Sequence, residues 1–259
     1  MSKAPQRGKL RNPPRARQYA FIAVVIVLLV VGGSGVFVYV TRSTSTTSAS
    51  SGSSTSSGSS STSTGGFSNT PCAAQTTSTS GPNGTYALIC TNNGLIVVQL
   101  SSSSTMTATV QNFVTLAKSG FYNDLVWHRI VPGFVIQSGD PTTKNGQGDR
   151  TQWGSGTSTT TIPLQIDPNE PNVAGSIAMA SPSGGLASSQ FFINLVNNTS
   201  LNGNYAVFGQ VVSGMAVVTN IGKLPIITNT CTSTGGSECD QPVDPTEAYI
   251  VSVTIQNTP

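Results

Sequence analysis

The sequence predicts a mainly β domain, a closed eight-stranded antiparallel barrel capped by two α-helices, carried behind an N-terminal anchor and a flexible tether. Three observations lead to this prediction. Short apolar runs recur between turn residues after about residue 80, an uncharged apolar run lies near the N-terminus, and a long Ser, Thr and Gly stretch separates the two.

The N-terminal run has the pattern of a single-pass membrane anchor. Residues 19–40 carry no charge, and as a helix they would span roughly 33 Å, enough to cross a bilayer core. Six of the twelve Lys and Arg residues lie in residues 1–18, so the positive-inside rule places this basic tail in the cytoplasm and the domain outside the cell membrane. Cleavage as a signal peptide near Gly33 and Gly35, which would release a secreted protein, is the alternative.

Residues 41–66 are predicted to be a flexible linker, because a stretch of almost only Ser, Thr and Gly cannot bury enough apolar surface to fold. The domain, residues 67–259, has five basic residues against nine acidic ones, a formal charge of −4. This balance argues against nucleic acid as a partner, since binding phosphates needs clustered cations.

Four cysteines in an exported chain predict two disulfides and not a metal site, because none has the C-x-x-C spacing. Three connectivities are possible. Pairing Cys72 with Cys90 and Cys231 with Cys239 is favoured, since each pair then brackets a short Ser, Thr and Gly-rich loop.

Eight short apolar runs bounded by turn residues are predicted to be strands. They are residues 85–90, 95–100, 126–130, 134–138, 175–180, 190–196, 205–212 and 248–255. Helices are predicted at residues 105–119, where apolar residues recur at helical spacing and a glycine follows, and at 215–221. Closure into a barrel would remove the edges that so many strands would otherwise expose.

Two long segments have no periodicity, residues 139–163 and 229–245. Such loops are either functional or surface decoration. Decoration is the preferred interpretation of the second loop because two cysteines staple it, and Asp140 in the first is interpreted as a turn residue.

The stretch WHRIVPGFVIQSGD, residues 127–140, places polar groups inside an apolar pattern. Strand alternation predicts that Trp127 and Arg129 share one face and that His128 lies on the other. An arginine, an aromatic ring and Gln137 can therefore converge on one outer patch. A Ser-His-Asp hydrolase would have to use His128, the single histidine, and is not supported because no nucleophile-elbow motif is present.

Two blocks resemble the cyclophilins, peptidyl-prolyl cis/trans isomerases with an eight-stranded barrel and two capping helices. FYNDLVWHRIVPGFVIQSGDP, residues 121–141, is similar to the family signature. GSIAMASPSGGLASSQFFINLVNNTSLNGNYAVFGQVVSGMAVV, residues 175–218, is similar to its second conserved segment. The resemblance covers residues 83–256 and includes the helical TVQNFVTLA.

The resemblance makes Arg129 the catalytic arginine, with Phe134 and Gln137 as its neighbours. It implies a substrate site with Phe192 as the floor of a proline pocket, and the residues of that site are Val135, Ala180, Ser181, Gln190, Phe192, Leu201 and Tyr205. Ser200 stands where many members have a tryptophan, so tight cyclosporin binding is not expected.

The resemblance therefore implies a prolyl isomerase that acts on proline-containing polypeptides. The basic tail, the anchor and the tether, a pattern typical of bacteria, place it at the cell membrane, where it is expected to assist the folding of exported proteins. Such an isomerase needs no cofactor and no metal. A non-catalytic proline-peptide-binding chaperone or scaffold on the same fold is the alternative, favoured by Val135 and Ser181, which replace the family's usual methionine and asparagine.

Overall fold

The computed structural model describes residue 72 and residues 83–181, 185–229, 231 and 238–258, all within one compact unit. The predicted basic tail, anchor and linker lie outside these residues. Within the described part of the chain, no helix is both long and apolar enough to span a membrane.

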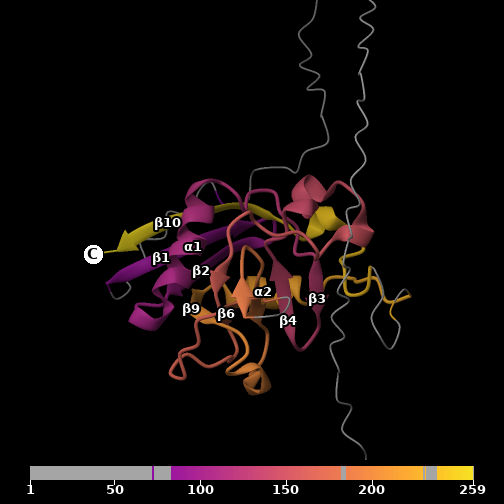
Figure 1. The fold of residues 1–259 in the computed structure, drawn as a ribbon. Coiled ribbons are helices and arrows are strands. Elements are labelled where there is room, and N and C mark those ends of the chain that lie inside the picture. Colours follow the sequence, from indigo (N-terminus) through magenta and orange to yellow (C-terminus); the bar gives the residue numbers. More distant parts are fainter. Residues whose placement is uncertain (1–71, 73–82, 182–184, 230, 232–237, 259) are drawn as a thin grey trace, which may run out of the picture. The chain divides into compact units, whose positions relative to one another are not determined.

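The domain is built around one eight-stranded antiparallel sheet in the order β10-β1-β2-β9-β6-β8-β4-β3 (Figure 1). Its strands are β1 (Gly84–Thr91), β2 (Gly94–Leu100), β3 (Arg129–Val131), β4 (Val135–Ser138), β6 (Ser176–Met179), β8 (Phe191–Asn194), β9 (Val207–Ser213) and β10 (Ile250–Thr258). A small second sheet, not foreseen from the sequence, pairs β5 (Ile162–Pro163) with β7 (Leu186–Ala187).

The predicted closed barrel is found as a curled, open sheet. The strand order ends at β10 and at β3, and the two end strands are not paired with each other among the described residues. An isolated antiparallel bridge between Val126 and Tyr249 links the segments that precede them. The predicted strand 126–130 yields only a three-residue strand, because the backbone N–H of Trp127 donates to Ala248, before β10, and strand pairing with β4 begins only at Arg129.

The two predicted helices are present as α1 (Thr107–Lys118) and α2 (Met215–Ile221). Short 3-10 turns are added to these, namely η1 (Ser104–Met106), η2 (Pro141–Gly146), η3 (Arg150–Gln152), η4 (Thr199–Leu201) and η5 (Pro245–Glu247). The first helix is entered through η1, where the Ser103 hydroxyl accepts a hydrogen bond from the Thr105 N–H. It stops before Gly120, which has a φ of +72°.

An aromatic cluster forms the centre of the core. Phe113 of α1 lies 5.0 Å from Tyr122, 5.5 Å from Phe191 and 5.1 Å from Phe208 between ring centroids. Trp127 packs edge-on against Phe191 at 5.7 Å. Trp127 is therefore a core residue, and the prediction that it shares a face with Arg129 is wrong, because regular strand alternation begins only at β3.

Both favoured disulfides are present, Cys72–Cys90 and Cys231–Cys239, with Cα–Cα distances of 5.8 Å and 4.9 Å. The first ties the segment before β1 to the end of that strand. The second closes a nine-residue loop between α2 and β10.

Candidate active site

Strand register places five side chains in one row across the outer face of the sheet. Arg129 of β3 pairs with Gln137 of β4, and Gln137 pairs with Phe192 of β8. Phe192 pairs with Ala178 of β6, which in turn pairs with Val207 of β9. Residues that are directly opposite in register point to the same face of a sheet, so the row runs from a cation through an amide to an apolar floor.

The apolar end of this row is a cluster separate from the main core. Alternation along β8 sends Phe191 into the main core and Phe192 into this outer cluster, as the sequence predicts. The cluster buries Val135, Ala178, Phe192 and Val207 and includes the partly buried Val131, Phe134, Ala180, Leu201 and Tyr205. The Tyr205 ring stands edge-on to Phe192 with centroids 5.4 Å apart, so the cluster forms an aromatic-walled apolar surface beside the arginine.

Two glutamines connect this surface to the loop after β4. Gln137 Nε2 donates a 2.8 Å hydrogen bond to Gln190 Oε1. Gln190 Nε2 donates to the backbone carbonyls of Gly154 and Gly156, at 2.9 Å and 2.7 Å. Both N–H donors of the Gln190 amide are thus used, and its oxygen holds Gln137 in place across the row.

Asp140 also binds the loop at residues 154–156. It was predicted to be a turn residue, and it has this second role in addition. Its buried carboxylate accepts hydrogen bonds from the backbone N–H and the hydroxyl of Thr142 and from the N–H groups of Gly154 and Gly156. A side chain at position 156 would place its Cβ 2.2 Å from Asp140 Oδ1. Gly156 is therefore needed for the loop to reach both Asp140 and Gln190.

His128, directly before Arg129 in the chain, is buried, with an exposed fraction of 2%. Among the residues that the structure describes, neither ring nitrogen has a hydrogen-bond partner of good geometry. Burial lowers the pKa of His128 to about 4, assisted by the charge of Arg129 and opposed by the Asp140 carboxylate. A neutral, enclosed ring without a serine partner does not form a hydrolase triad.

The group that faces Arg129 was not foreseen from the sequence. The carboxylate of Asp240 lies 3.6 Å from Arg129 Nε, measured to Oδ2. Asp240 belongs to the disulfide-stapled loop that was interpreted as decoration. Asp240, which directly follows the disulfide-bonded Cys239, therefore contacts the candidate site.

Comparison with known proteins identifies the family. The family model described as cyclophilin type peptidyl-prolyl cis-trans isomerase matches residues 86–249. The chain belongs to this family. Peptidyl-prolyl cis-trans isomerases of Helicobacter pylori and Schizosaccharomyces pombe are 39% identical over 146 residues and 37% identical over 134 residues. These alignments cover 55% and 52% of this chain and 83% of each relative.

A cyclophilin-type isomerase of Cryptosporidium parvum has a similar structure, with a TM-score of 0.56 and 26% identity over 68% of this chain and 99% of that chain. A second structure of that protein, in the presence of the dipeptide Ala-Pro, gives a TM-score of 0.55 and the same identity over 67% of this chain.

In this cyclophilin-type domain, the backbone beside the apolar cluster is fixed by hydrogen bonds. The Ala180 N–H donates to the Gln190 carbonyl at 2.9 Å. The Ser181 hydroxyl donates to the Leu186 carbonyl at 2.7 Å, so it is already engaged within the domain. Ser200, the position of the missing tryptophan, is exposed on η4 next to Leu201.

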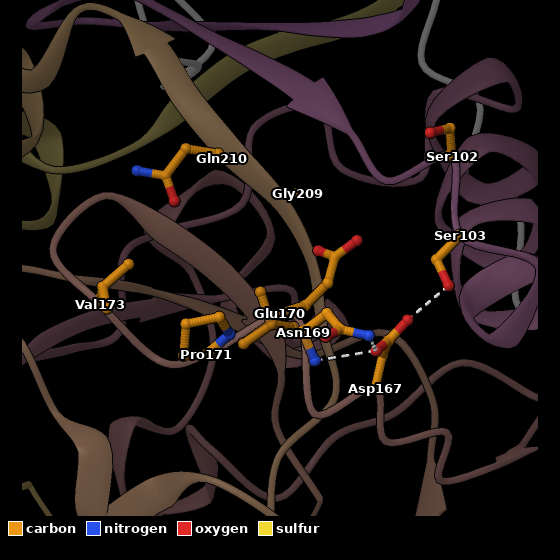
Figure 2. A pocket seen from close by; sticks show the side chains of 10 residues that line it. Ser102, Ser103, Asp167, Asn169, Glu170, Pro171, Val173, Gly209 and Gln210 are labelled. Atoms are coloured by element: carbon orange, nitrogen blue, oxygen red, sulfur yellow. Dashed lines mark hydrogen bonds between the residues drawn. The ribbon is translucent and has the colours of Figure 1, made fainter.

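A polar pocket of about 470 Å³ lies on another part of the cyclophilin-type domain (Figure 2). It is lined by Ser102, Ser103, Asp167, Asn169, Glu170, Pro171, Val173, Val207, Gly209 and Gln210. Of these residues only Val207 belongs to the apolar cluster, and Asp167 and Glu170 are hydrogen-bonded to the hydroxyls of Ser103 and Ser101. This pocket therefore lacks the arginine and aromatic rings of the candidate site.

One cluster has the composition of a metal site but not its chemistry. The sulfurs of Cys231 and Cys239 and a carboxylate oxygen of Asp240 lie within 4.8 Å of one another. The two sulfurs are joined in a disulfide, and only a thiolate binds metal well.

Proposed function

We propose that the domain catalyses cis/trans isomerisation of X-Pro peptide bonds at the row formed by Arg129, Gln137 and Phe192. The observation that carries the proposal is the placement of a guanidinium at the edge of an otherwise apolar, aromatic-walled surface. Family membership supports the same assignment, because the relatives are named as isomerases of this bond.

The chemistry requires both ends of the row. Rotation about an X-Pro bond is slow because amide resonance gives the C–N bond partial double-bond character, with a barrier of about 18–20 kcal/mol. Arg129 lowers this barrier by donating a hydrogen bond to the prolyl nitrogen in the twisted state, where the lone pair is localised. This interaction is stronger in the transition state than in the ground state, as catalysis requires.

The apolar cluster binds the proline ring and provides a surrounding of low dielectric constant for the guanidinium. Phe134, Val135, Phe192 and Leu201 hold the proline ring, and the exclusion of water strengthens the field of the guanidinium. Ala180 and Ser181 form the edge along which the substrate backbone lies. The Cryptosporidium parvum structure in the presence of Ala-Pro supports a proline-containing peptide as the ligand.

A protease-coupled assay with X-Pro tetrapeptides tests this function. The full chain, purified in mild detergent, should accelerate isomerisation, and Arg129→Ala should lower kcat/KM by about 10²- to 10³-fold, the range for loss of one electrostatic donor. Phe192→Ala should chiefly raise KM, because it removes the floor of the proline pocket.

A non-catalytic peptide-binding module is the second candidate. The engaged hydroxyl of Ser181 favours it, since this side chain is not free to bind the substrate backbone. Tight binding of a proline peptide by a folded chain that does not accelerate isomerisation would replace the first proposal by this one.

We also propose that the domain is exported and held at a bacterial cell membrane by residues 19–40, where it assists the folding of exported proteins. The uncharged run, the basic residues before it and the Ser, Thr and Gly stretch after it support this arrangement. Extraction of membranes with alkaline carbonate should leave the full-length chain in the pellet. A soluble product whose N-terminus begins after Gly33 would instead show signal cleavage.

A further inference from the structure

In the described part of the chain, Arg129 forms one ion pair with a carboxylate, through Nε. The separation from Asp240 Oδ2 is 3.6 Å, within the range of an ion pair but longer than a hydrogen bond. Among the described residues, no hydrogen bond engages the two Nη groups of Arg129. The pair therefore occupies one end of the guanidinium and leaves the other end for a ligand.

The backbone of Asp240 is fastened to the same strand as Arg129. The Ile130 N–H donates a 2.7 Å hydrogen bond to the Asp240 carbonyl, which covers the otherwise unpaired edge of β3. The Asp240 N–H donates to Ile227, and the Ile227 N–H donates to Gln241. Asp240 is thus held from both sides and contacts two consecutive residues of β3.

The backbone conformation of Asp240 is energetically unfavourable for a residue other than glycine. Its φ is +65°, in the left-handed region that non-glycine residues seldom adopt. Such a conformation persists only where the surroundings enforce it, and it is typical of functional positions. The enforcing element is adjacent, because Cys239 immediately precedes Asp240 and is joined to Cys231.

We propose that Asp240 is a positioning residue for the guanidinium of Arg129 and that the Cys231–Cys239 disulfide, next to it in the chain, holds it in place. The carboxylate fixes the Nε end of Arg129, so that the Nη groups remain directed at the prolyl bond. This role rests on the isomerase function proposed above. Asp240 is therefore part of the active site, although it lies far from the arginine in sequence.

The test compares Asp240→Asn with a matched control, Asp124→Asn, in the full chain. Asp124 also has a positive φ, of 60°, and its carboxylate pairs with Lys144 Nζ at 3.7 Å. The exposed fractions of the two aspartate side chains are 26% and 28%. Asparagine keeps the shape and tolerates the left-handed region, so only the charge is removed.

Two readouts separate positioning from general stability. Asp240→Asn should lower kcat about three- to fivefold, the effect expected from the loss of a partly exposed ion pair, while KM stays within twofold. The NMR signal of the Arg129 Nε–H, assigned with Arg129→Lys, should shift and exchange faster with solvent. Asp124→Asn should change neither. Asp240→Gly, which suits the positive φ, should reproduce the result if the asparagine variant folds poorly.

The contribution of the disulfide is tested by combining variants. Replacing both Cys231 and Cys239 with serine should lower kcat to a similar extent, with no further fall when Asp240→Asn is added. An unchanged Nε–H signal and kcat in Asp240→Asn, or equal losses in Asp124→Asn, would overturn the proposal. If the unmodified chain does not catalyse isomerisation, the isomerase function fails, and the Nε–H signal alone decides whether Asp240 positions the guanidinium.

Discussion

Replacing His128 with glutamine should remove most of the pH dependence of stability between pH 7.5 and pH 5. His128 is the single histidine of the chain, and burial lowers its pKa from 6.5 to about 4. The unfolded state therefore takes up a proton near pH 6.5, whereas the folded state stays neutral until about pH 4. Stability is fully present above pH 6.5 and falls as the pH decreases towards 4, because the unfolded state then binds more protons.

The size of the effect follows from the difference between the two pKa values. Each pKa unit is worth about 1.4 kcal/mol, so the complete loss is roughly 3 kcal/mol and the loss between pH 7.5 and pH 5 is roughly 2 kcal/mol. Asp149, Asp167 and Asp244 have pKa values lowered below 3.8 by hydrogen bonds from neighbouring residues. Their contributions change below about pH 4, outside this window.

Urea unfolding of the full chain, followed by the fluorescence of the buried Trp127 and Trp153, measures the effect. The unmodified chain should lose roughly 2 kcal/mol of unfolding free energy between pH 7.5 and pH 5. His128→Gln should be nearly flat over this range, whatever its stability at pH 7.5. An unmodified chain that is equally stable at both pH values, or a variant with the same loss, would refute a neutral, buried His128.

Three further predictions concern the hydrogen bonds of Gln190, the aromatic core, and Ser200, which stands where many cyclophilins have a tryptophan. Gln190→Leu should lower kcat/KM about tenfold in the tetrapeptide assay. The substitution frees Gln137 and removes the donor that the Gly154 and Gly156 carbonyls share. Unchanged activity would show that Gln137 does not need this hydrogen bond. Phe113→Ala should lower the free energy of unfolding in urea by about 3–5 kcal/mol, because it leaves a cavity at the centre of the aromatic cluster. A loss below about 1 kcal/mol would contradict the central position of Phe113 in the core. Ser200→Trp should tighten cyclosporin binding at least tenfold, about 1.4 kcal/mol, as measured by calorimetry. Equal affinities of the two chains would show that this position does not limit cyclosporin binding.

Local patterns predicted most of the elements. The apolar runs that became β1, β2, β4 and β8 alternate or are buried on both sides, and their periodicity is visible in a few residues. The helix predicted at 215–221 has the bounds of α2. The split of Phe191 and Phe192 between two clusters also follows from alternation alone.

Interactions distant in sequence explain what was missed. Trp127 was assigned to the face of Arg129 because the strand was expected to begin at residue 126, but that segment pairs with the chain before β10. Asp140 and Asp240 resemble ordinary turn residues in sequence, and only the fold shows that one fastens the loop at residues 154–156 and the other faces Arg129.

The most direct test of the central claim is NMR exchange spectroscopy of an X-Ala-Pro-X peptide with the full chain. This measurement follows cis/trans exchange at equilibrium without a coupling protease and reports peptide binding in the same spectra. We expect rapid exchange with the unmodified chain. With Arg129→Ala the peptide should still bind but exchange at least about 10²-fold more slowly. Exchange that is equally fast in the Arg129→Ala chain would contradict catalysis by the guanidinium.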